Sequence, residues 1–78
     1  MIEELDCIAF TRALPEYGLD EGDVGTVVAV HKQGAGFTVE VVSLTGETVA
    51  IVTLPADAVR PVAEGEIAHA RKLTHAAE

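Results

Sequence analysis

Acidic side chains gather in one short stretch of the chain, and carboxylates are groups that can transfer protons or bind hard cations. The stretch contains Glu16, Asp20, Glu21 and Asp23. Acid–base catalysis needs carboxyls with different pKa values in a cleft, and calcium needs about six or more oxygen ligands. The spacing is not that of an EF-hand, which alternates Asp or Asn and closes on Glu. We interpret the stretch as a solvated acidic loop, with protein binding as its functional alternative. A hydrolase that uses Glu16, Asp20 and a histidine is a further hypothesis, but no motif of suitable spacing supports it.

Histidine and cysteine are the other residues that could bind metal or attack a substrate. The chain has His31, His69, His75 and a single cysteine, Cys7. Zinc takes four nitrogen or sulfur ligands in a structural site and three with a water in a catalytic one. A nucleophilic cysteine needs a base and electropositive surroundings, whereas the neighbours of Cys7 are acidic and apolar. We expect a buried core thiol, no metal, no cofactor and no catalytic residues, and therefore a protein that is not an enzyme.

The glycines at positions 22 and 25 resemble a phosphate-binding turn only in composition. No GxxxxGK[ST] pattern follows, and the next element is predicted to be a strand rather than a helix. Asp23 is expected to accept hydrogen bonds from backbone amides of its own turn. Gly25 is expected where another backbone comes close. The segment is therefore predicted to shape the fold.

Five apolar segments that favour β-structure position these residues. We predict strands over residues 7–11, 24–31, 37–42, 48–54 and 59–62, with a surface loop over 12–22 and a glycine turn over 33–36. Alternation places Phe37, Val39 and Val41 on one face. Residues 48–54 are apolar at both alternating sets, which favours a central strand, and Pro55 predicts a 3₁₀ turn before the last strand, an edge strand that tolerates Pro61. The fold class is all-β, a small five-stranded SH3-like barrel with a short C-terminal helix or an extra strand.

The domain organisation follows from these elements. Residues 1–62 form the barrel, and residues 63–78 form a tail segment packed on the barrel or on a second copy. Ile67, Ala70 and Leu73 have helical spacing, and acidic residues early with basic residues late suit a helix dipole. Helix is favoured, although Ile67, His69, Arg71 and Leu73 would equally line one face of a strand.

Composition limits the classes of partner. The chain has 78 residues, 49% of them apolar, with two Phe and one Tyr, so an aliphatic core with Phe10 and Phe37 is expected. The net charge of −8 repels polyanions, which disfavours nucleic acid and anionic membranes. A single cysteine, an acidic N-terminus without a leader pattern and the lack of a long apolar run together predict a cytoplasmic protein.

Two resemblances follow from particular segments. Residues 25–30, 37–42, 52–54 and 57–59 resemble the KOW-type SH3-like barrel of transcription factors and ribosomal proteins, which implies RNA or ribosome contact. Over nearly the whole chain, the segments 5–11, 14–19, 22–28, 59–61 and 66–71 resemble a family of short bacterial proteins catalogued as domain of unknown function 4926. This second resemblance implies small accessory proteins encoded beside other genes, with an antitoxin-like role, and carries over no catalytic residues.

We therefore predict a protein-interaction module whose partner is another protein, basic or toxin-like, with a homodimer expected through free strand edges. The alternative is an RNA- or ribosome-associated KOW-like module, which the acidic charge disfavours. Tyr17 would either anchor a partner or fold back over the barrel mouth. The predicted partner-binding residues are Glu16, Tyr17, Asp20, Glu21, His69 and Arg71.

Overall fold

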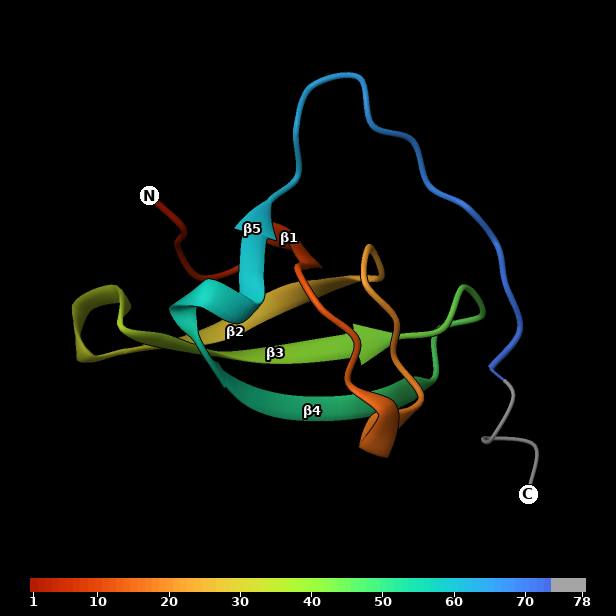
Figure 1. The fold of residues 1–78 in the computed structure, drawn as a ribbon, viewed down its shortest axis with the longest axis horizontal. Coiled ribbons are helices and arrows are strands. Elements are labelled where there is room, and N and C mark those ends of the chain that lie inside the picture. The colour runs from red at the N-terminus through yellow and green to blue at the C-terminus, as the bar shows by residue number, and fades with distance from the viewer. Residues whose placement is uncertain (74–78) are drawn as a thin grey trace.

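The computed structural model describes residues 1–73, which form five strands in one antiparallel sheet (Figure 1). The strands are β1 (Cys7–Phe10), β2 (Val24–His31), β3 (Gly36–Val42), β4 (Thr48–Pro55) and β5 (Val59–Pro61). Three 3₁₀ turns connect them: η1 (Pro15–Tyr17), η2 (Lys32–Gly34) and η3 (Ala56–Ala58). The sheet order is β4-β3-β2-β1-β5. The all-β, five-stranded prediction is confirmed, including the 3₁₀ turn before the last strand and the edge position of that strand.

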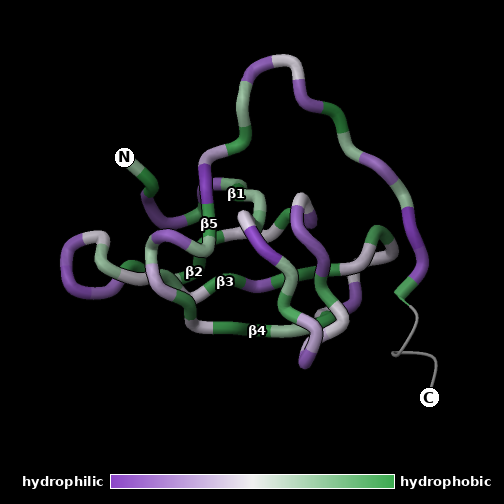
Figure 2. The backbone as a smooth tube through the Cα atoms, viewed as in Figure 1, coloured by the Kyte–Doolittle hydropathy of each residue, from purple (hydrophilic) through white to green (hydrophobic). Residues whose placement is uncertain are grey.

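The core lies on the concave face of the curled sheet. On β3, Phe37, Val39 and Val41 are buried while the residues between them are partly exposed, as the alternation predicts. Figure 2 shows hydrophobic stretches concentrated along the strands. The buried cluster is aliphatic apart from its two phenylalanines, and it consists of Ile8, Phe10, Leu14, Leu19, Val27, Phe37, Val39, Val41, Val52, Leu54, Ala58 and Val59.

β4 lies at an edge of the sheet, so its predicted central position is wrong. Within the described residues it pairs only with β3. Val52 and Leu54 face the core, but Ile51, opposite Glu40, is 61% exposed. Apolar residues at both alternating sets therefore do not indicate burial of both faces here, because Ile51 is exposed and Val49 is only partly buried.

Gly25 lies on β2 close against the neighbouring strand β3, and the predicted close approach is confirmed. A Cβ atom at this position would lie 2.5 Å from Val39 Cγ1 and 3.1 Å from the carbonyl oxygen of Glu40. Two residues later the register shifts between Val27 and Ala29, which marks a β-bulge. Bulges bend strands, so this shift helps β2 to curve around the core.

The loop between β1 and β2 is partly buried, so the prediction of a surface loop over residues 12–22 holds only for its polar residues. Leu14 and Leu19 are 7% and 1% exposed and belong to the core. Their backbones exchange two hydrogen bonds, from Leu14 N to Leu19 O at 2.8 Å and from Leu19 N to Leu14 O at 3.1 Å. Between them, η1 forms a tight turn. The two leucines therefore anchor the loop, and the polar residues around them are held in fixed positions.

The predicted helix in the tail is wrong over the described residues. After β5 the chain turns at residues 64–65 and then runs without helix or strand to Leu73, arching away from the sheet (Figure 1). The side chains of Glu66 and Arg71 both bond to the barrel, to Arg60 and Asp23. A helix rises only about 1.5 Å per residue, so an extended backbone reaches farther between two such contacts. His75, a residue considered for metal binding, lies outside the described residues.

Candidate interaction surface

The acidic loop presents most of the predicted partner-binding residues on one segment. Glu16 and Tyr17 lie on η1, and Asp20 and Glu21 follow it just before β2. The three carboxylate residues are exposed, and Tyr17 is 38% exposed. Because Leu14 and Leu19 fix the loop on the core, these side chains project from an ordered base.

Asp23 organises the end of this loop. Its Oδ2 atom accepts a hydrogen bond of 2.7 Å from the amide of Asp20, and its own amide donates to the carbonyl of Asp20 at 3.1 Å. Its carbonyl accepts from the amide of Phe10 at 2.9 Å. The predicted role of Asp23 in stabilising its turn is confirmed. The carboxylate is consequently oriented by backbone contacts of the barrel itself.

The tail supplies a guanidinium to this carboxylate. Arg71 Nε donates to Asp23 Oδ1 at 3.0 Å, and Nη2 donates to Asp23 Oδ2 and, at 3.0 Å, to the carbonyl oxygen of Gly18. Asp20 Oδ2 lies 3.7 Å from Arg71 Nε. Burial alone would raise the pKa of Asp23. The hydrogen bonds from Arg71 and from the amide of Asp20, together with the positive charge of Arg71, outweigh this effect, so the pKa of Asp23 is lowered.

A second ion pair fastens the start of the tail. Arg60 and Glu66 form two parallel hydrogen bonds of 2.9 and 2.7 Å. Glu66 also accepts a hydrogen bond of 2.6 Å from the amide of Ala63. The hydrogen bonds from Arg60, then that from Ala63, hold the pKa of Glu66 at about 2. The hydrogen bonds to Glu66 raise the pKa of Arg60, and the charge of Glu21 adds to this effect.

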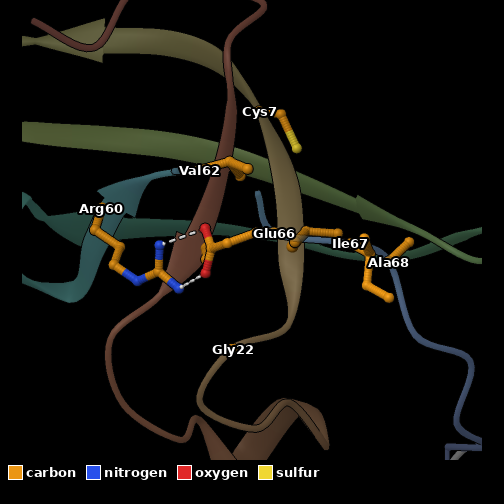
Figure 3. A pocket seen from close by; sticks show the side chains of 9 residues that line it. Cys7, Gly22, Arg60, Val62, Glu66, Ile67 and Ala68 are labelled. Atoms are coloured by element: carbon orange, nitrogen blue, oxygen red, sulfur yellow. Dashed lines mark hydrogen bonds and ion pairs between the residues drawn. The ribbon is translucent and has the colours of Figure 1, made fainter. Parts of the chain in front are cut away.

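A pocket of about 230 Å³ lies between the tail and the outer face of the sheet (Figure 3). Val24 and Ala9 line it from the sheet, and Ile67 and Ala68 line it from the tail. Cys7 also lines it and is exposed, so the expectation of a buried thiol is wrong. Ile8 and Phe10 take the inward positions of β1, and Cys7 lies on the opposite face together with Ala9. Ala9 is buried, whereas Cys7, the first residue of the strand, is exposed.

The structure brings two of the six predicted partner-binding residues together, Asp20 and Arg71. Asp20 and Arg71 meet at Asp23, while Glu16, Tyr17 and Glu21 lie on the same loop without a bond to the tail among the described residues. His69 is exposed on the tail. Sequence reasoning gave Asp23 a structural role only and missed the carbonyl of Gly18, because no local pattern signals contacts with a residue 48 and 53 positions away.

Two further features are absent from the part of the chain that the structure describes. In residues 1–73, no three side chains of His, Cys, Asp or Glu converge as metal ligands would. Within the same residues, the chain contains no helix with the length and apolar character needed to cross a membrane.

A protein-family model matches most of the chain. The family model described as "Domain of unknown function (DUF4926)" matches residues 4–61. No curated protein and no solved structure matches the chain. The matched segment includes Gly18, Asp20 and Asp23, whereas Glu66 and Arg71 of the tail lie beyond it.

Proposed function

We propose that this chain, which belongs to the DUF4926 family, is a non-enzymatic protein-interaction module that binds a basic partner protein through its acidic loop. Its role is that of an accessory, antitoxin-like protein that acts on the product of a neighbouring gene. We place it in the cytoplasm, where the exposed thiol of Cys7 suits a reducing environment. A homodimer through a free strand edge is part of the same proposal.

The anchored acidic loop is the observation that carries this proposal. Glu16, Asp20 and Glu21 are exposed beside the partly exposed ring of Tyr17. The loop is fastened to the core by Leu14 and Leu19, so a partner would meet these groups without first ordering them. Preorganised surfaces bind more tightly because less conformational entropy is lost on association.

The charge distribution supports a basic protein as the partner. Of the five basic side chains in the sequence, Arg12, Arg60 and Arg71 already form ion pairs with carboxylates of the same chain. The thirteen acidic residues thus remain largely uncompensated. Opposite charge accelerates association and selects against partners of the same sign, which disfavours nucleic acid.

Affinity capture from the source organism, with quantitative mass spectrometry at low and moderate salt, tests the proposal. Three chains serve as bait: the wild type, a loop variant with Glu16→Gln, Asp20→Asn and Glu21→Gln, and a control variant with Glu3→Gln, Glu4→Gln and Glu47→Gln. Both variants lose the same formal charge, and the control acids are also exposed.

We expect one basic protein to be recovered by the wild type and the control variant and to be lost with the loop variant. Recovery should fall at moderate salt, because salt screens exposed charges. Repeated recovery of no specific protein, or equal recovery by all three chains, would overturn the proposed role of the loop.

A further inference from the structure

We propose that Asp23, Asp20 and the carbonyl of Gly18 form a receptor for an arginine side chain of the basic partner, which Arg71 of the tail occupies until that partner displaces it. This inference rests on the proposed function and specifies the chemistry that the partner presents. The occupant is the observation that points to the ligand: a guanidinium that comes from outside the acidic cluster is already bound there.

The receptor is built without the tail. The carboxylate of Asp23 is oriented by the amide of Asp20, and the backbone of Asp23 is bonded to Phe10. Gly18 closes η1 in the left-handed region, with φ of 73°, and its amide bonds to Pro15 at 3.1 Å, so its carbonyl is also fixed. All of these groups lie in residues 10–23. The site therefore keeps its shape when the tail departs.

The geometry suits arginine rather than lysine. Adjacent Nε and Nη2 donors of Arg71 meet the two oxygens of one carboxylate, and Nη2 also reaches the carbonyl of Gly18. A planar guanidinium can make this paired contact, whereas an ammonium presents a single point of charge. The receptor is therefore expected to distinguish the two basic side chains.

Little apolar burial supports the tail between its two ion pairs, since residues 66–70 are all exposed. Between its two ion pairs it arches away from the sheet, and Ile67 is 91% exposed (Figure 1). The adjoining pocket beside Val24 stays open, although Ile67 and Ala68 lie along its rim (Figure 3). A partner segment that places its arginine on Asp23 and an apolar side chain in this pocket would bury surface that the tail leaves exposed. Such a segment can replace Arg71.

A peptide with the sequence of residues 64–73 serves as the probe. Binding is followed by nuclear magnetic resonance, from the amide shifts of Gly18, Asp20 and Asp23, with wild type, Arg71→Ala and the double variant Arg71→Ala/Asp23→Asn. Lys72→Ala is the matched control, because it removes the same charge one residue farther along the tail. A second peptide carries lysine in place of Arg71. Dispersed spectra of each variant establish that it is folded.

We expect Arg71→Ala to bind the arginine peptide about tenfold more tightly than the wild type or Lys72→Ala does, because the site is no longer occupied within the chain. The lysine peptide should bind several-fold more weakly, and the double variant should show no shifts at the three amides. Equal binding by wild type and Arg71→Ala, or equal binding of both peptides, would overturn the receptor.

The two proposals fail differently. If a captured partner binds wild type and the double variant equally but is lost with the loop variant, the acidic loop binds it and the arginine receptor is wrong. If the peptide behaves as expected and no partner is captured, the receptor stands and the proposed function is wrong.

Discussion

Arg71 and Asp23 are separated by 48 residues in the sequence and form the most enclosed ion pair among the described residues. Their side chains are 28% and 21% exposed, against 41% and 39% for Arg60 and Glu66. The pair joins the tail, near the last described residue, to the turn that directly precedes β2. It therefore connects a segment outside the family match to a turn inside it.

Removing Arg71 should free the tail without unfolding the barrel. Ion pairs near a surface contribute about 0–1 kcal/mol, so we expect Arg71→Ala to lower the unfolding free energy by about 1 kcal/mol or less. The heteronuclear NOE of residues 67–72 should fall, while that of the five strands stays unchanged. Lys72→Ala is the control. An equally rigid tail in Arg71→Ala would show that this contact does not hold it.

The second ion pair gives a pH prediction. The pKa of Glu66 is about 2, against an ordinary 4.5, so its pair with Arg60 favours the attached tail fully above pH 4.5. That contribution is lost as the pH falls through the pKa of the folded state, near 2. A carbon-13 titration of the Glu66 carboxyl should give a midpoint near 2. Arg60→Gln should move it up toward 4.5, and an unmoved midpoint would contradict the pairing.

The anchoring leucine of the acidic loop should be a major stabilising residue. Leu19 is 1% exposed, so Leu19→Ala should cost about 2–5 kcal/mol in the free energy of unfolding. Leu44, which is 83% exposed, provides the matched control, and Leu44→Ala should change stability by about 0.5 kcal/mol or less. Denaturant unfolding measures both. Similar costs for the two variants would mean that the loop is not anchored in the core.

The close contact at Gly25 gives a fourth prediction. A valine there would meet Val39 and the backbone of Glu40, so Gly25→Val should cost about 1–3 kcal/mol through overpacking. For a domain of this size, each kcal/mol lowers the melting temperature by about 4–8 °C. Ala29→Val, at a half-buried position of the same strand, should have a much smaller effect. An unchanged melting temperature for Gly25→Val would show that the register of β2 is wrong.

The sequence was sufficient for the strands because their signals are local. Alternation over Phe37–Val42 and the proline before η3 each act over a few residues, and both predictions are confirmed. The position of β4 was not predictable in this way, since Ile51 is apolar yet solvent-exposed. Apolar patterning reports which residues can be buried, whereas the sheet order decides which of them are.

The candidate site was predictable only in part. Charge alone picked out Glu16, Asp20 and Glu21, and the alternative strand pattern of the tail included Arg71. The pairing of Arg71 with Asp23 depends on the path of the tail. The apolar spacing of the tail predicted a helix, whereas the contacts of Glu66 and Arg71 with the barrel accompany an extended backbone. Long-range ion pairs of this kind leave no periodic signal in a sequence.

The most direct test of the interaction surface is the dissociation constant of the captured partner. Titration calorimetry measures it at two salt concentrations for the wild type, the loop variant and the control variant. We predict binding at least about tenfold weaker for the loop variant, a change of about 1.4 kcal/mol, and a loss of affinity at the higher salt. The control variant should stay within about threefold of the wild type. Equal weakening in both variants would mean that net charge, and not the loop anchored by Leu14 and Leu19, governs binding, and would contradict the proposed surface.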